Sequence, residues 1–309
     1  MPCGSPASKD RLAIGGYRLL NLILPNGTFE PSTIKLFEEA GLPVVRRNSR
    51  SYSAAIDDPR IAKVKFLRPA EIPGAVEKGQ FDIGLCGAHS VREARATVVE
   101  VLDLGPTGRA GGVPRIVLAV AGNLGIQSAG ELPNGVRVST EFPNLADDYF
   151  SGKGIKAQIS FSHGATEAKV PEIADAIVEL TETGSTLQEA GLVILDTLSP
   201  CSLKLIANDV AWTDPEKSSA IGEIAMLLGS VLDARERVLL KMNVPSGKLD
   251  EVIARLPPTT SPTVLCVFDS TFYRVETVVQ RSCLNVLIPD LKKRGAADLI
   301  ELPISKTLR

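Results

Sequence analysis

The stretch AIVELTETGSTLQEAG, residues 176–191, decides how the middle of the chain folds. An apolar run opens it, acids and threonines follow, and Thr-Gly-Ser-Thr at 183–186 leads into a segment of helical composition. This order predicts a buried strand, a tight loop and a helix starting near Ser185. Side chains two apart share a face of a strand, so Asp175, Ile177 and Glu179 are expected to point the same way.

The predicted loop has the chemistry of an anion site. The first N–H groups of a helix lack partners within the helix, and the helix dipole there favours negative charge. Gly184 permits close approach of the backbone, and the hydroxyls of Thr183, Ser185 and Thr186 supply further donors. The loop therefore predicts a cradle for a phosphate monoester, with the upstream carboxylates accepting hydrogen bonds from sugar hydroxyls. A solvent-exposed turn with a Ser/Thr N-cap is the alternative, and the loop alone leaves both open.

Outward from this stretch, short apolar strands alternate with amphipathic helices, which predicts α/β sheets covered on both faces. More than 200 residues of this pattern fit two lobes, with ligands at the carboxyl ends of strands or in the cleft between lobes. We expect a flexible lead over 1–16, a first lobe over 17–115 completed by about 196–225, and a second lobe over 116–195 that carries the loop.

The last third of the chain has a different element order. A long helix is expected from Pro215 to Arg235, and a β-α-β-β-α-β series follows it. This order is typical of the ferredoxin-like arrangement and predicts a separate C-terminal domain over 230–309.

Composition excludes several classes of partner. The formal net charge of −2 gives no basic footprint for nucleic acid, and no stretch approaches the ~18 apolar residues of a membrane helix. The five cysteines form no C-x-x-C pair, so we expect reduced thiols and a cytoplasmic protein. The two histidines make no metal site. His89 is interpreted as a loop or helix-start residue, whereas His163 could be a base or could line a cleft.

The segment ADAIVELTETGSTL, residues 174–187, resembles the phosphoribosyl-pyrophosphate motif of phosphoribosyltransferases. From about residue 18 to the end, the chain resembles ATP phosphoribosyltransferase of the long, histidine-regulated form. FLRPAEIPGAVEKGQFDIGLCG at 66–87 and GVRVSTEFPNLADDYFSGKGI at 135–155 support this resemblance. It implies two lobes similar to periplasmic binding proteins, with the active site between them, and a C-terminal regulatory domain.

The resemblance also implies a reaction and its ligands. A ring nitrogen of ATP would attack the anomeric carbon of phosphoribosyl pyrophosphate, and pyrophosphate would leave. Mg²⁺ would be bound mainly through the substrate, histidine would inhibit, and dimers would assemble into a hexamer.

The site residues that the resemblance implies fall into four groups. The catalytic candidates are Asp175, Glu179 and Arg68. The phosphoribosyl-pyrophosphate candidates are Thr183, Gly184, Ser185, Thr186 and Leu187. The cleft candidates are Asn26, Gly27, Glu167 and Lys169. The regulatory candidates are Asn243, Thr263 and Asp298.

Three places depart from the family pattern. Thr28 stands in the first turn where the family often has Lys or Arg, Asp147 and Asp148 replace two basic residues, and a family Asp is replaced near His89. The cations that could compensate are Arg68, Arg109, Arg115, Lys153 and Lys169. A diverged, non-catalytic paralogue that binds a small anion is therefore the alternative hypothesis.

Overall fold

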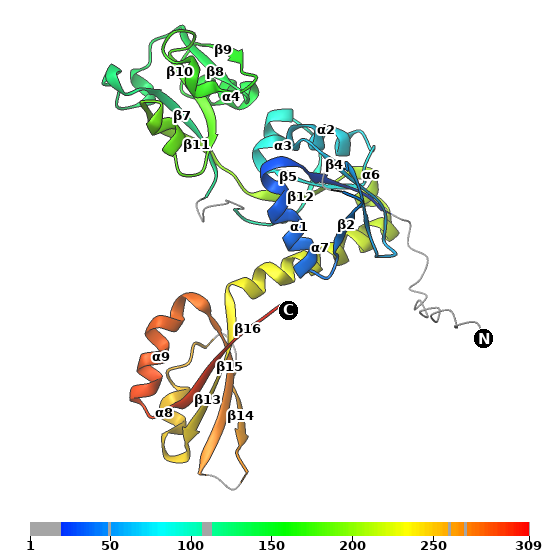
Figure 1. Ribbon diagram of the computed structural model, residues 1–309, viewed down its shortest axis with the longest axis vertical. Helices are drawn as coiled ribbons and strands as arrows, with labels where there is room; N and C mark the ends of the chain where they lie inside the picture. Colours follow the sequence, from blue (N-terminus) through cyan, green and yellow to red (C-terminus); the bar gives the residue numbers. More distant parts are fainter. Residues whose placement is uncertain (1–19, 49–50, 107–112, 259–260, 269–270, 309) are drawn as a thin grey trace, which may run out of the picture. The chain divides into compact units, whose positions relative to one another are not determined.

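A computed structural model describes residues 20–48, 51–106, 113–258, 261–268 and 271–308 (Figure 1). The expected lead over 1–16 lies outside the described residues. Tertiary contacts divide the chain into two units, Met1–Thr33 with Val44–Glu223 and Ile34–Pro43 with Ile224–Arg309. Two helices, α1 (Glu30–Glu39) and α7 (Pro215–Arg235), contribute residues to both units.

The first unit holds a seven-stranded sheet, which with its helices we call lobe I. Its strand order is β2-β3-β4-β1-β5-β12-β6, with β1 parallel to β4 and β5 and with β12 antiparallel to β5 and β6. The strands are β1 (Leu20–Pro25), β2 (Val44–Arg46), β3 (Ser53–Ile56), β4 (Ile61–Leu67), β5 (Ile83–Gly87), β6 (Val99–Asp103) and β12 (Leu203–Ala207). The helices are α2 (Ile72–Glu77), α3 (Ala88–Ala94) and α6 (Asp209–Thr213). The interior strand β5 is buried along its whole length, as its run of apolar and small residues predicts.

The first unit also holds a five-stranded sheet, which with its helices we call lobe II. The strand order is β11-β7-β10-β8-β9. The strands are β7 (Arg115–Ala121), β8 (Val136–Thr140), β9 (Ala157–Phe161), β10 (Ala176–Thr181) and β11 (Leu192–Pro200), and the helices are α4 (Pro143–Gly152) and α5 (Ser185–Glu189).

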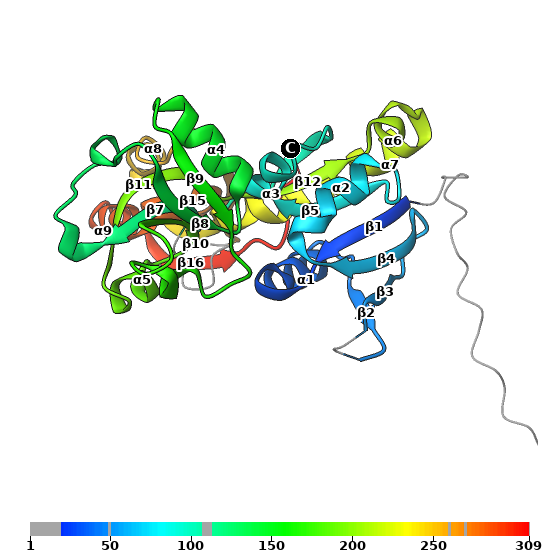
Figure 2. The ribbon, with the colours of Figure 1, turned by 90° about the horizontal axis from the view of Figure 1, so that it is seen from above.

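Side chains of lobe II alternate between two cores, one on each face of the sheet. Ala176 and Val178 of β10 pack with Phe150 of α4, whereas Ile177 packs with Leu187 of α5. Figure 2 shows α4 and α5 on opposite faces of this sheet. The strand, loop and helix expected over 176–191 are thus observed, with α5 beginning at Ser185.

The second unit contains a four-stranded antiparallel sheet in the order β14-β15-β13-β16. Its elements are β13 (Arg237–Pro245), α8 (Leu249–Ile253), β14 (Thr263–Cys266), β15 (Phe272–Gln280), α9 (Leu284–Lys293) and β16 (Ala297–Pro303). The two helices pack on one face, against alternate residues of β13 and β15. The expected fold class, two α/β lobes followed by a ferredoxin-like domain, is confirmed.

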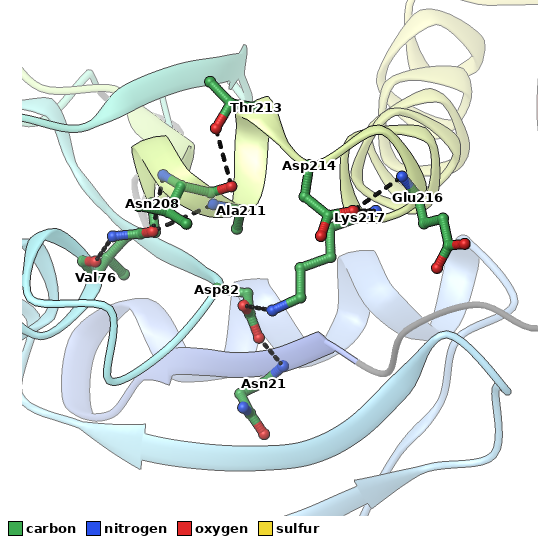
Figure 3. A network of polar contacts seen from close by, with 10 residues as sticks. Asn21, Val76, Asp82, Asn208, Ala211, Thr213, Asp214, Glu216 and Lys217 are labelled. Atoms are coloured by element: carbon green, nitrogen blue, oxygen red, sulfur yellow. Dashed lines mark hydrogen bonds and ion pairs between the residues drawn. The ribbon is translucent and has the colours of Figure 1, made fainter.

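Hydrogen bonds and an ion pair connect the start of α7 to lobe I (Figure 3). The buried carboxylate of Asp82 accepts hydrogen bonds from the N–H of Asn21 at 2.8 Å and from Nζ of Lys217. Asn208 caps α6 by accepting from the N–H groups of Val210 and Ala211. Asp214 caps α7 in the same way, and the helix begins at Pro215 as expected.

Two expectations about composition can be compared with the described residues. No helix in them is long and apolar enough to cross a bilayer. The four cysteines within the described ranges are all free thiols.

Candidate active site

A cavity of about 490 Å³ lies at the carboxyl ends of strands from both lobes of the first unit. Lobe I contributes residues that follow β1, β4 and β5, including Asn26, Gly27, Phe29, Arg68, His89 and Glu93. Lobe II contributes residues at the ends of β8, β9 and β10, including Glu141, Phe142, Phe161, Ser162, His163 and Leu180. Ligands of α/β proteins bind at such strand ends, so three lobe I candidates, Asn26, Gly27 and Arg68, lie where a ligand is expected.

The predicted phosphate loop leaves β10 at this same end. Gly184 has φ of +82°, a left-handed conformation that favours glycine. Its N–H donates to Oγ1 of Thr181 at 2.9 Å, and the hydroxyls of Thr183 and Ser185 are 3.0 Å apart. The loop thus gathers hydroxyls around a turn that a residue with a Cβ would strain.

Glu179 is the carboxylate nearest this loop on β10. One of its oxygens, Oε2, is buried and has no hydrogen-bond partner among the described residues. Burial raises the pKa of Glu179, the carboxylates of Glu141 and Glu167 raise it further, and a hydrogen bond with Thr166 opposes them. A buried, partly satisfied acceptor of this kind suits a ligand that brings hydroxyl donors.

Glu167 and Lys169, two of the cleft candidates, lie in the segment that packs against Glu179. Nζ of Lys169 donates to Oγ of Ser162 at 2.6 Å, and Oγ of Ser162 is 2.8 Å from Oγ1 of Thr166. Thr166 in turn bonds Glu179. This chain of contacts connects the cation of Lys169, two hydroxyls and the carboxylate of Glu179, and Ser162 within it lines the cavity.

Asp175, the other carboxylate expected to act together with Glu179, lies apart from this group. It precedes β10 and forms an ion pair with Arg137 at 2.6 Å, and hydrogen bonds from this guanidinium lower the pKa of Asp175. Four residues of strand separate the two carboxylates by about 13 Å. Alternation predicts which face of a strand two residues share, but it does not place them at the same end of that strand.

Two of the departures from the family pattern, Asp147 and Asp148, form ion pairs with a residue of lobe I. Arg95 of lobe I lies 3.0 Å from Asp148 and 3.9 Å from Asp147 of α4. Lys153, one of the cations expected to compensate, pairs instead with Asp196 at 3.1 Å. The side chain of Thr28 and all of Arg109 lie outside the described part of the chain.

His89 is buried and lines the cavity, neither of which the sequence predicts. It is the second residue of α3, as a helix-start residue should be, but it is only 3% exposed and lines the cavity. Its ring lies 6.3 Å from that of Phe29 and 5.6 Å from that of Phe142. Burial lowers the pKa of His89 to about 4, so the imidazole is neutral at physiological pH.

The three regulatory candidates lie on the sheet of the second unit. Nδ2 of Asn243 donates to Oδ2 of Asp298 at 2.7 Å. Thr263 lies opposite Glu276 in the neighbouring strand pair, and Glu276 forms an ion pair with Lys241 at 2.9 Å. The structure therefore brings Asn243 and Asp298 into contact and leaves Thr263 two strands away.

No group of three or more metal-ligating side chains is formed by the described residues.

Comparisons with known proteins agree along nearly the whole chain. A family model described as "ATP phosphoribosyltransferase" matches residues 68–230, and one described as "HisG, C-terminal domain" matches residues 234–306. The ATP phosphoribosyltransferase of Desulforudis audaxviator is 40% identical over 289 residues, which are 94% of this chain and 99% of the relative. That of Pelotomaculum thermopropionicum is 39% identical over the same shares of both chains.

A solved structure supports the same relationship. The ATP phosphoribosyl transferase (HisG:HisZ) complex from Thermotoga maritima contains a chain that is 27% identical, with a TM-score of 0.57. The match covers 70% of the present chain and 99% of that one. By the matched family models and by the identity to relatives over their full length, this chain belongs to the ATP phosphoribosyltransferase family.

Proposed function

We propose that this chain condenses ATP with 5-phosphoribosyl 1-pyrophosphate, giving 1-(5-phosphoribosyl)-ATP and pyrophosphate, the first step of histidine biosynthesis. Membership of the family supports this function. The observation that supports it most is the end of β10, where Leu180 lines the cavity and Glu179 and the turn at Gly184 flank Leu180 in the chain.

The roles of the site residues follow from their chemistry. Glu179 accepts hydrogen bonds from the ribose hydroxyls through its unsatisfied oxygen. The backbone and hydroxyls over 183–187 hold the phosphate monoester. Arg68 supplies positive charge to the leaving pyrophosphate, and Asn26, Gly27, Glu167 and Lys169 shape the cleft.

The reaction needs no protein nucleophile. A ring nitrogen of the purine donates its electron pair to the anomeric carbon while the bond from that carbon to the pyrophosphate oxygen breaks. The chain's own contribution is to align the two substrates and to stabilise charge on the departing group. A divalent metal ion accompanies the activity, and we assign it as Mg²⁺, which would screen the negative charge of the pyrophosphate.

The function is tested by mixing the protein with ATP, phosphoribosyl pyrophosphate and Mg²⁺ and measuring pyrophosphate. We expect release by the natural chain. Glu179→Ala should lower kcat/KM for phosphoribosyl pyrophosphate by about 10- to 150-fold, because about 1.5–3 kcal/mol of hydrogen bonding to a charged group is lost. Asp175→Ala is the matched control, since its exposed pair with Arg137 is worth little. Equal effects of the two substitutions would contradict the assignment, and no release by the natural chain would favour a binding protein.

Regulation is assigned to the domain over 230–309, which we propose binds histidine. Asn243 and Asp298 offer acceptors for the ammonium or imidazole, and Thr263 offers a donor for the carboxylate. The ligand must bind one state of the enzyme better than the other, and a 100-fold preference corresponds to about 2.7 kcal/mol of coupling. We also propose that the chain works in the cytoplasm as dimers assembled into a hexamer.

Histidine should inhibit without competing with phosphoribosyl pyrophosphate. Asn243→Lys and Thr263→Ala should raise the inhibitory concentration about tenfold or more, as expected when one or two hydrogen bonds are lost, while leaving turnover intact. Cys266→Ser, in the same strand as Thr263, is the control. Full sensitivity in both variants would place the pocket elsewhere.

A further inference from the structure

Arg115 is a cation placed directly beside the phosphate loop. It is the first residue of β7, and the antiparallel register puts it opposite Thr181, the last residue of β10. Directly opposed residues of an antiparallel pair have Cβ atoms about 4.5–5.5 Å apart. The loop that contains Gly184 begins at that same residue, because Oγ1 of Thr181 accepts the Gly184 N–H.

The side chain of Arg115 leaves the sheet on the face that α5 covers. Val117 and Ala119 of β7 pack with Leu187 of α5 in one apolar cluster. Residues two apart on a strand share a face, so Arg115 continues this row toward the end where the loop leaves the sheet. The face and the end of the strand both place Arg115 next to the loop.

The guanidinium is also incompletely satisfied. Nε of Arg115 is buried and has no hydrogen-bond partner within the described ranges of the chain. A buried donor without a partner costs about 1–3 kcal/mol, so such a group is retained where a ligand completes it.

The loop needs a cation from outside its own sequence. Residues 181–187, Thr-Glu-Thr-Gly-Ser-Thr-Leu, contain no Lys or Arg, and Glu182 and the preceding Glu179 add negative charge. A phosphate monoester carries about −1.5 to −2 at neutral pH, and hydroxyls and N–H groups alone do not neutralise it.

We propose that Arg115 binds the monoester phosphate of phosphoribosyl pyrophosphate together with the loop at 183–187. The assignment rests on the proposed function and adds a residue to its substrate site. The planar guanidinium donates to phosphate oxygens in a fork, including through the Nε–H, which has no partner among the described residues. Arg115 is thus the loop's counter-charge, supplied by the neighbouring strand.

The test separates the two phosphate groups of the substrate. Calorimetry with ribose 5-phosphate should show at least about tenfold weaker binding for Arg115→Gln than for the natural chain, the loss expected for a charged hydrogen bond. Binding of inorganic pyrophosphate should stay within about twofold. The KM for phosphoribosyl pyrophosphate should rise in parallel while the KM for ATP stays near its natural value. The affinity of Arg115→Lys for ribose 5-phosphate should lie between those of the natural chain and Arg115→Gln, because lysine keeps the charge but cannot donate in a fork.

Arg137→Gln is the matched control, because Arg137 lies on the same sheet at the end where Asp175 precedes β10. Thermal unfolding of all variants checks that they are folded. If Arg115→Gln does not fold, Arg115→Lys replaces it in the binding measurements. Unchanged ribose 5-phosphate binding, or weakening of pyrophosphate alone, would overturn the assignment. A natural chain that binds ribose 5-phosphate through Arg115 yet releases no pyrophosphate would leave the assignment standing and reject the proposed reaction.

Discussion

Gly184→Val is expected to abolish binding of phosphoribosyl pyrophosphate while the protein stays folded. At φ of +82° a β-branched residue is strained, and a Cβ would lie 3.2 Å from Cδ1 of Ile194. The turn would therefore relax toward negative φ and withdraw the loop's donors. Losing two hydrogen bonds to a charged phosphate, at about 1.5–3 kcal/mol each, weakens binding by more than about 100-fold.

The control for this substitution is Gly154→Val. Gly154 has φ of +72° with open space around its Cα, and it lies just beyond α4. Valine at position 154 would have the same backbone strain, but this position lies outside the phosphate loop at 183–187. Calorimetry with phosphoribosyl pyrophosphate should find natural affinity for Gly154→Val and none for Gly184→Val. Equal affinity of the two variants would contradict the assignment of the loop at 183–187 as the phosphate-binding site.

His89 should make the first unit sensitive to acid. Its folded pKa of about 4 lies below its ordinary value of 6.5, so between these pH values the unfolded chain binds a proton that the folded chain does not. Stability therefore rises with pH in this window: the contribution of His89 is fully present above about pH 6.5 and is lost as pH falls toward 4. A shift of this size corresponds to about 3 kcal/mol.

Urea unfolding at pH 7, 5.5 and 4 measures this effect. His89→Gln should reduce the stability difference between pH 7 and pH 4 by about 3 kcal/mol, since glutamine does not titrate. His163, the chain's other histidine, is exposed, and His163→Gln is the control. The same pH dependence in both variants would show that His89 is not buried as a neutral ring.

The sequence predicts elements best where local signals agree. The α7 helix has the expected bounds because Asp214-Pro215 marks its start and a basic residue its end. The strand, loop and helix around Gly184 follow from an apolar run and a glycine that the turn requires. In contrast, β2, β3 and β6 were not predicted, because they are short and partly exposed and lack an apolar run.

Site residues are predictable where the chemistry is local and not where the fold creates it. The loop at 183–187 carries its donors in consecutive residues. The burial of His89 comes from Phe29 and Phe142, which are remote in sequence, so no local signal reveals it. Arg115 reaches the loop only through the pairing of β7 with β10. Asp175 lies away from Glu179, which periodicity does not predict, because it gives the face of a strand and not its end.

The position of β12 has a consequence for how the chain is made. In the lobe I sheet, β12 (Leu203–Ala207) lies between β5 and β6, although all of lobe II separates it from them in sequence. A nascent chain that leaves the ribosome in order has the five contiguous strands of lobe II complete before β12 emerges. Lobe II can therefore form its sheet before β12 joins lobe I, and until then β6 has no neighbouring strand to pair with. The long-range closure by β12 should be a late and slow event in folding, and until it occurs the edge of β5 needs protection from other chains.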